Sequence, residues 1–537
     1  MSNTNRFLYH TLIFGFGGVV AQLVPLILLP LYANYLTPAE YGITDLVFRA
    51  SYIVNTVLMV NGVRLALFAF YRQAEDEPSR HRVAVTMSAF LWVAITISIT
   101  IACVFAGQID RFLNIGNNNL LAFGMTAVFL ESLVAVPMAL FQVRLESIRF
   151  VLTNLTMLLL RLLLCIYLVV WLQMGVWGVL FSQFAINLVF GVMLTMIELF
   201  RFPARPDFSL LWPIVRFAWP FIPMGIVGFC CGNMDRFFLT NYGPYTDSEY
   251  ALAAVGLYAL AFRLMDFAGV LGASPMQRVW TAQMYDIHKQ PGAEIVFGNY
   301  ALRIVFVQMF FVLGISVFAS EIVRTLCSPA YFAAASIMPI AGLYTCFLIF
   351  MNQLESIFYI TRKTQYKLVN LVILLPITAV LMYLLVPSYG ILGAAIAFAS
   401  ATLVNCVTLF FITQRFFAVR YPFKRFAVLF VISTLCYLLS TLFGSGIEIS
   451  TLTELQFGEL TKWEKLTDAF SRIHYFPLIW KACCIFLWCG LIWVSGVLLP
   501  EDKEMIAKNL QRLSQKFTRR KKEKTSPGTD INTEPEA

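Results

Sequence analysis

Apolar stretches of about 20 residues recur along almost the whole chain, and they decide what it can fold into. At a helical rise of about 1.5 Å per residue, such a stretch crosses the roughly 30 Å of hydrocarbon in a bilayer. Because a backbone in lipid must satisfy its own hydrogen bonds, each stretch predicts a transmembrane helix. The sequence contains fourteen such stretches, at residues 11–33, 43–66, 83–106, 119–141, 150–172, 176–198, 214–240, 251–275, 297–320, 332–357, 368–387, 390–414, 426–444 and 477–499.

The composition agrees with a chain that lies mostly in lipid. Of 537 residues, 59% are hydrophobic and 13% are charged, whereas about 25% of a soluble domain is charged. Four scattered histidines and eleven cysteines, most of them inside apolar stretches, show no spacing typical of a metal site. The sequence therefore predicts an all-α polytopic membrane protein with no metal centre and no catalytic residues.

Lysine and arginine are distributed unequally between the two sets of predicted loops. Of the 39 in the chain, the loops opposite the amino terminus hold only Arg111, Arg324, Lys462, Lys465 and Arg472. Positively charged loops stay in the cytoplasm, so both termini are predicted to be cytoplasmic. The excess of lysine and arginine in cytoplasmic loops then accounts for the net charge of +9. Because the charge has this explanation, no nucleic-acid partner is expected.

Two parts of the chain repeat each other at a nearly constant offset. The pairs at an offset of 214 are Gly42/Gly256, Leu46/Leu260, Phe48/Phe262, Arg49/Arg263 and Arg64/Arg278. Asn154/Asn370 and Gly175/Gly390 extend the match at offsets of 216 and 215. Predicted spans 1 to 6 and 7 to 12 are therefore two copies of six helices. Because six is even, both copies begin on the same side of the membrane, which makes them parallel repeats.

The repeat predicts how the chain is divided. Residues 1–200 form an amino-terminal lobe and residues 201–420 a carboxy-terminal lobe, each of six helices around a central cavity. Residues 421–500 add two helices joined by an outer loop at 445–476. The tail at 501–537 is basic, which predicts contact with anionic membrane lipids.

An arginine falls at the same intramembrane position in both copies, at Arg49 and Arg263. A charge inside the bilayer is costly, so it indicates a functional site by default. If both side chains face the seam between the lobes, they form a cationic cavity suited to phosphate groups, which guanidinium binds with two parallel hydrogen bonds. Arg64, Arg161 and Arg278 complete the predicted substrate-binding set.

Internal ion pairs are the alternative interpretation of these arginines. Asp45 lies four residues before Arg49, and Asp266 lies three residues after Arg263, both within reach on one helix. The two interpretations are compatible, because an ion pair can open when a substrate arrives. Four intramembrane acids are candidates to bind a coupling proton or sodium ion, and no other cofactor is expected: Asp235, Asp266, Glu131 and Glu355.

Short motifs add a family resemblance to these patterns. Leu36-Thr37-Pro38-Ala39-Glu40-Tyr41-Gly42 follows the first span, and the stretch from Gly62 to Phe68 ends the second. With fourteen spans and the six-plus-six repeat, the chain resembles Wzx-type polysaccharide or O-antigen repeat-unit flippases of the multidrug/oligosaccharidyl-lipid/polysaccharide (MOP) exporter superfamily. The resemblance covers roughly residues 6 to 500.

The resemblance implies a fold, a substrate and a location. It implies two helical lobes in a V around a central cavity, as in MATE-like folds. It also implies that an undecaprenyl-diphosphate-linked oligosaccharide crosses the bacterial inner membrane by alternating access, for cell-surface polysaccharide biosynthesis. That lipid-linked glycan and polysaccharide assembly proteins are the implied partners. Relatives that flip the peptidoglycan precursor use arginines on the first, second and eighth spans. Arg49 and Arg263 match those of the second and eighth spans. The first span offers only Arg6, which weakens an assignment of the peptidoglycan precursor as the substrate.

Two other functions compete with this interpretation. A cation-coupled exporter of the same fold commonly has twelve spans and acidic cavity residues, and the extra helices and arginines argue against it. A membrane glycan polymerase or glycosyltransferase needs catalytic groups on large outer loops. Only 445–476 is long here, and its acids form no recognisable pair, so an enzyme is not expected.

Overall fold

The part of the chain described by the computed structural model is helical and contains no strand. The described residues are 27–57, 66–67, 70–71, 74, 76–144, 146–201, 205–219, 221–361, 363, 365–443, 475–500 and 502–504. The first predicted span, the outer loop at 445–476 and the tail at 501–537 lie largely outside these residues, so the total of fourteen helices stays a prediction.

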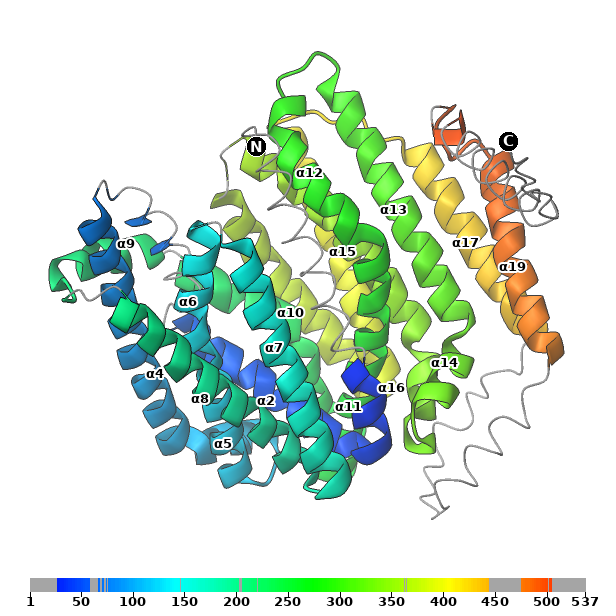
Figure 1. Ribbon diagram of the computed structural model, residues 1–537. Helices are drawn as coiled ribbons and strands as arrows, with labels where there is room; N and C mark the ends of the chain where they lie inside the picture. The colour runs from blue at the N-terminus through cyan, green and yellow to red at the C-terminus, as the bar shows by residue number, and fades with distance from the viewer. Residues whose placement is uncertain are drawn as a thin grey trace, which may run out of the picture.

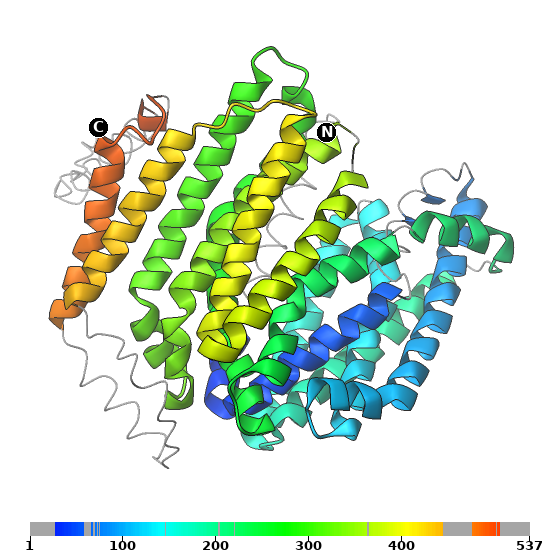
Figure 2. The ribbon, with the colours of Figure 1, turned by 180° about the vertical axis from the view of Figure 1, so that it is seen from behind.

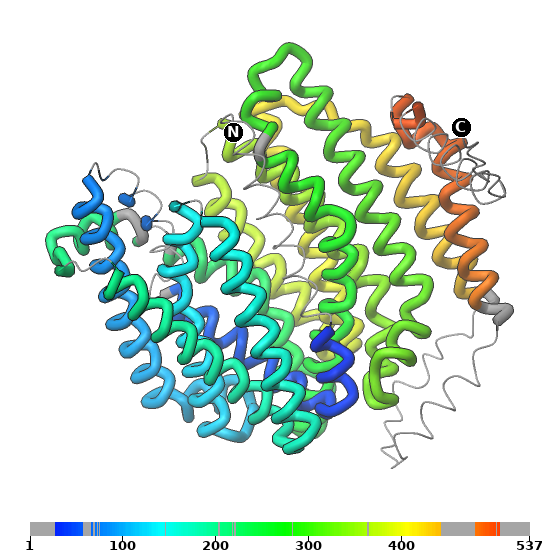
Figure 3. The backbone as a smooth tube through the Cα atoms, viewed as in Figure 1, coloured from blue at the N-terminus to red at the C-terminus, as the bar shows by residue number. Residues whose placement is uncertain are grey.

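The helices form two bundles that lie side by side (Figures 1 and 3). The amino-terminal bundle consists of α2 (Pro38–Val57), α4 (Glu77–Leu113), α5 (Asn118–Phe129), α6 (Glu131–Val143), α7 (Ser147–Ile166), the π-helical η1 (Tyr167–Trp171) and α8 (Gly175–Arg201). The short η2 (Phe208–Leu210) and α9 (Leu211–Ala218) connect it to the second bundle.

The carboxy-terminal bundle is larger and includes the last helices of the chain. It consists of α10 (Phe221–Tyr242), α11 (Ser248–Ala268), the π-helical η3 (Gly269–Ala273), α12 (Ser274–Ile287), α13 (Ala293–Val317), α14 (Ala319–Leu326), the 3-10 helix η4 (Pro329–Ser336), α15 (Met338–Ile360), α16 (Gln365–Gln414), α17 (Phe423–Phe443) and α19 (Tyr475–Val494). Figure 2 shows α17 and α19 together at the outer edge, beside α13.

Nine helices of the described chain are long and apolar enough to cross a membrane. The longest of them, α16, contains the predicted spans 368–387 and 390–414, which meet at Gly390. The helices α2 and α10 are not among the nine, and both carry charged residues within the apolar stretches predicted as spans 2 and 7. The prediction of an all-α polytopic membrane protein is confirmed.

Two glycines that the sequence matches between the predicted repeats share an unusual backbone angle. Gly175 begins α8 with φ of 53°, and its counterpart Gly390 interrupts α16 with φ of 54°. These left-handed values favour glycine because it has no Cβ. In each copy a second glycine, Gly178 or Gly393, packs closely on the preceding helix, against Leu168 and Leu385.

The motif that carries the family resemblance is the start of a helix. The Thr37 hydroxyl accepts a hydrogen bond from the Glu40 backbone N–H at 3.2 Å, and Glu40 Oε2 accepts one from the Thr37 N–H at 2.8 Å. This reciprocal pair is a capping box, and Pro38 supplies the fixed φ suited to the first helical turn. The motif therefore sets where α2 begins.

Immediately after this cap, α2 crosses α11 at a pair of glycines that the repeat had matched. Gly42 of α2 lies against the backbone of Leu252 and Gly256, and Gly256 lies against the backbone of Pro38 and Gly42. A Cβ on either glycine would collide with a carbonyl oxygen, of Leu252 or of Pro38. The two bundles thus meet backbone to backbone, an approach that only small residues permit in membrane helices.

Hydrogen bonds join the bundles around this crossing, on the face drawn at the bottom of Figure 1, which we call the lower face. Asn34 Nδ2 donates to the carbonyl oxygen of Leu326 at 2.7 Å, and the Tyr331 hydroxyl donates to that of Leu36 at 3.2 Å. The opposite face, where α8 ends and α12 turns into α13, is the upper face.

A buried ion pair attaches the last helix to the carboxy-terminal bundle. Lys481 Nζ of α19 lies 2.6 Å from Glu321 Oε1 of α14, and the Lys481 side chain is only 7% exposed. Trp488 of α19 also donates from Nε1 to the Ser433 hydroxyl of α17 at 2.8 Å. The two helices that follow the repeat are therefore bonded to it and to each other.

We expect Gly42→Ala and Gly256→Ala each to lower the thermal unfolding midpoint in detergent, because the added methyl group overpacks the crossing at a cost of about 1–3 kcal/mol. The matched control is Gly314→Ala, since a Cβ at that helical glycine meets nothing within 4 Å. Unfolding midpoints equal to the control for both variants would contradict this account of the crossing.

Candidate functional site

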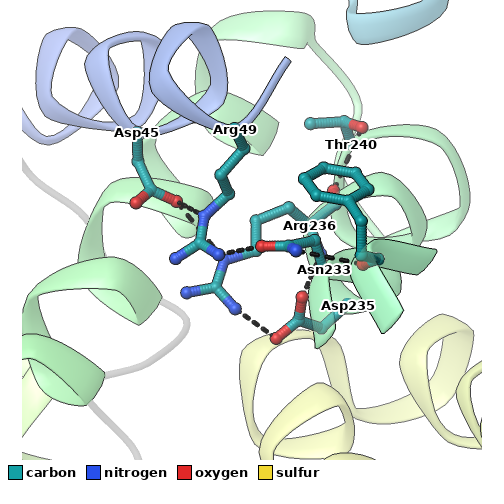
Figure 4. A network of polar contacts seen from close by, with 7 residues as sticks. Asp45, Arg49, Asn233, Asp235, Arg236 and Thr240 are labelled. Carbon is teal, nitrogen blue, oxygen red and sulfur yellow. Dashed lines mark hydrogen bonds and ion pairs between the residues drawn. The ribbon is translucent and has the colours of Figure 1, made fainter. Parts of the chain in front are cut away.

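Charged side chains of α2 and α10, one helix from each bundle, meet in a network of polar contacts (Figure 4). Asp45 of α2 is shared by two guanidinium groups: its Oδ2 lies 2.6 Å from Arg49 Nε and 3.3 Å from Arg236 Nε. Arg49 belongs to the same helix, whereas Arg236 comes from α10 of the other bundle. One carboxylate therefore bridges the two halves of the molecule.

A second contact across the bundles orients Arg49. Its Nη1 donates a hydrogen bond to Oδ1 of Asn233 on α10, and Asn233 in turn donates from Nδ2 to the Phe229 carbonyl oxygen at 3.0 Å. The Arg49 side chain nevertheless stays 29% exposed. It is held in position while part of it remains accessible.

Arg236 is the most enclosed arginine of this group. Its side chain is 5% exposed, it pairs through Nη1 with Oδ2 of the fully buried Asp235, and its backbone N–H donates to Asp235 Oδ1 at 2.9 Å. The rings of Tyr258 and Phe262 lie 4.8 Å and 5.7 Å from its guanidinium carbon, within the range of cation–π contacts. The sequence analysis gave Arg236 no role, and its only signal was an Asp-Arg pair in an apolar helix.

Arg263 and Asp266 complete the group. Every residue of α11 from 251 to 268 is buried except these two, which are exposed and lie one turn apart. Asp266 interacts electrostatically with Arg263, Arg236, Arg49 and Asp45. The structure thus gathers six charged residues into what we call the central cluster: Arg49, Arg236, Arg263, Asp45, Asp235 and Asp266.

The repeated arginines Arg49 and Arg263 both interact electrostatically with Asp266, but they are not an excess of positive charge. Three aspartates accompany three arginines in the central cluster. The predicted ion pair between Asp45 and Arg49 is present. In the described part of the chain, neither Arg263 nor Asp266 has an ion-pair partner within 4.0 Å.

Of the other predicted substrate-binding arginines, the structure describes Arg161 and Arg278. Arg161 of α7 donates from Nη2 to Asn187 Oδ1 on α8 at 2.7 Å, so it lies inside the amino-terminal bundle. Arg278 is exposed on α12. Arg64 lies outside the described residues.

The remaining acidic candidates have their own contacts. Glu355 of α15 pairs with Lys367 of α16 at 2.7 Å, and Glu131 accepts a hydrogen bond from Gln183 Nε2 at 3.1 Å. Asp235 is bound to Arg236. Among the described residues, no group of three histidine, cysteine or acidic side chains could hold a metal ion.

Residues 31–336, which include all six residues of the central cluster and both crossing glycines, match the family described as "Polysaccharide biosynthesis protein". The chain belongs to this family. A search of curated proteins finds no match to the sequence.

Solved structures show which fold this family member adopts. The lipid II flippase MurJ in an inward closed conformation matches with a TM-score of 0.67 at 12% identity, over 91% of this chain and 100% of that one. A multidrug resistance MATE transporter of the MOP superfamily matches in its inward-facing conformation with a TM-score of 0.55 at 14% identity, over 73% and 94% of the two chains. An outward-facing MATE structure gives 0.52 at 16% identity, over 76% and 94%.

At these identities the structural matches establish the fold. The chain has the fold of membrane transporters and flippases of the MOP superfamily, as predicted, and neither the family nor the structures point to an enzyme.

We expect Arg236→Met to destabilise the protein by about 3–5 kcal/mol, because it leaves Asp235 buried without its counter-charge. Adding Asp235→Leu should recover much of that loss, since removing both members of a buried pair is close to neutral. Thermal unfolding in detergent measures both effects, with Arg111→Ala, at an exposed arginine of α4, as the control. An Arg236→Met variant as stable as Arg111→Ala would show that the Arg236–Asp235 pair does not stabilise α10.

Proposed function

We propose that the protein carries a lipid-diphosphate-linked oligosaccharide across the bacterial inner membrane by alternating access, for cell-surface polysaccharide biosynthesis. The observation that carries this proposal is the accessibility of Arg49 and Arg263, the repeated arginines, in a cluster where the two bundles meet. Membership of the polysaccharide biosynthesis family and a fold shared with a lipid II flippase support it.

The chemistry of such a substrate explains why arginines are needed. A diphosphate and its sugars cannot cross hydrocarbon unaided, because each unpaired polar group and above all each charge is costly to bury. A guanidinium group offers two parallel N–H donors to a phosphate, which replaces the lost hydration. In this proposal the lipid tail stays in the bilayer while the head group passes between the bundles.

The proposal extends to orientation and movement. The residues 1–200 and 201–420 act as two lobes that rock against each other, with helices 421–500 attached to the second. The upper face is cytoplasmic, which places both termini in the cytoplasm and the basic tail on anionic lipids of the inner leaflet. Polysaccharide assembly proteins are the expected protein partners.

The central test uses the purified protein in liposomes with a fluorescent polyprenyl-diphosphate-linked sugar, and it measures how much label moves between leaflets. We expect Arg49→Ala and Arg263→Ala each to slow this movement at least tenfold, since a charged hydrogen bond contributes about 1.5–3 kcal/mol. Lysine at either position should restore only part of the rate, because it keeps the charge and loses the planar fork.

Arg111→Ala serves as the control, because Arg111 lies on exposed α4 outside the central cluster. Amounts of protein in the liposomes must be equal. Wild-type rates of label movement in both alanine variants would show that neither arginine takes part in transport. No movement of label with the wild-type protein would refute the proposed substrate.

Orientation has its own test. Green fluorescent protein fused after residue 537 should be fluorescent in cells, because it folds in the cytoplasm, and alkaline phosphatase at the same place should be inactive. The opposite pair of results would place the carboxy terminus outside and invert the assignment of the faces.

A further inference from the structure

The carboxylate of Asp266 is unlike the others of the central cluster. It is one of the two exposed residues of α11 between 251 and 268, next to Arg263 on the same face. In a helix that is otherwise enclosed, other protein atoms leave these two charged side chains uncovered. Because a charge is costly to place in hydrocarbon, an uncovered charged pair inside a membrane protein indicates a hydrated space. Asp266 therefore has access to water and to protons.

The groups that surround Asp266 come from four helices. Arg49 and Asp45 of α2, Arg236 of α10 and Arg263 of its own helix interact with it electrostatically. Tyr344 of α15 does so as well.

The other two carboxylates of the cluster are committed to ion pairs. Asp45 accepts from both Arg49 and Arg236, and Asp235 is fully buried against Arg236. Neutralising Asp45 leaves Arg49 without its counter-charge, and neutralising Asp235 breaks the buried pair with Arg236. Asp266 has no such pair among the described residues, so it can lose its charge without breaking one.

The charge of the cluster makes this difference important. With three arginines and three aspartates ionised, the cluster is neutral, while a lipid-linked diphosphate diester brings two negative charges. The carboxylate of Asp266 repels that anion and also competes with it for Arg263, three residues away. An incoming phosphate therefore favours a neutral Asp266.

We propose that Asp266 takes up one proton from water when a diphosphate group binds at Arg49 and Arg263, and returns it on release. The inference rests on the proposed function and adds the residue that links the substrate to protons. The sign follows directly: because the protonated form binds the anion better, affinity is highest at low pH and falls as the pH rises.

The experiment measures binding to the full-length protein in nanodiscs over pH 5.5 to 8.5. The probe is farnesyl-diphosphate-linked N-acetylglucosamine, a diphosphate diester whose own charge is constant over this range. For the wild type we expect the dissociation constant to rise with pH, by no more than about tenfold per pH unit because one proton is involved. Asp266→Asn should bind with the same affinity at every pH, close to the wild type at pH 5.5.

Three controls define the result. Asp266→Glu keeps a titratable group and should keep the pH dependence, and Asp286→Asn, at an exposed acid of α12, should behave as the wild type. Farnesyl-linked N-acetylglucosamine without the diphosphate should show no dependence on pH. A separate measurement uses the wild type alone. In weakly buffered solution, a pH-sensitive dye should report up to one proton taken up for each probe molecule bound.

Each contrary outcome has a distinct meaning. An unchanged pH dependence in Asp266→Asn, or no proton uptake by the wild type, overturns the role of Asp266 and leaves the substrate assignment standing. Affinity that depends on sodium but not on pH overturns the proton as the linked ion. A wild-type protein that does not bind the probe at any pH refutes the proposed function, and this inference with it.

Discussion

A carboxylate held between two guanidinium groups from different helices is the interaction on which the rest of the site depends. Asp45 makes it possible for Arg49 and Arg236 to lie inside a membrane protein, because a buried charge without a partner is far more costly than one with a partner. The helices that carry these residues, α2 and α10, are also two that fail the apolar criterion for a membrane span. Each of these two helices is tolerated in the membrane because its charged residues pair with those of the other helix.

The same two helices are positioned by features close to their ends. The capping box at Thr37 and Glu40 fixes the first turn of α2, and one turn later Gly42 brings its backbone against α11. From that point the helical rise places Asp45 and Arg49 opposite α10. A local hydrogen-bond pair, a steric requirement for glycine and an ion pair thus follow one another along a single helix, and each depends on the one before.

The sequence predicted the fold class well because its signals are local. The predicted spans and repeat follow from apolar length and from matched residues, and the matched Gly175 and Gly390 have nearly the same positive φ. The Asp45–Arg49 pair follows from a spacing of four on one helix. These features need no knowledge of which helices touch.

What the sequence did not provide was the partner across the interface. Arg236 has no counterpart in the repeat, so nothing marked it as the group that shares Asp45 with Arg49. Arg161 looked equivalent to the cluster arginines, yet it bonds to Asn187 within its own bundle. Both outcomes depend on helix packing, which spacing along one chain does not reveal.

The ion pair between Lys481 and Glu321 bears on how a chain of this kind can be shortened in evolution. Glu321 lies within the residues that match the family, whereas Lys481 belongs to α19. A chain that ended before α19 would leave the Glu321 carboxylate without this lysine, so a neutral residue at position 321 would be less costly there.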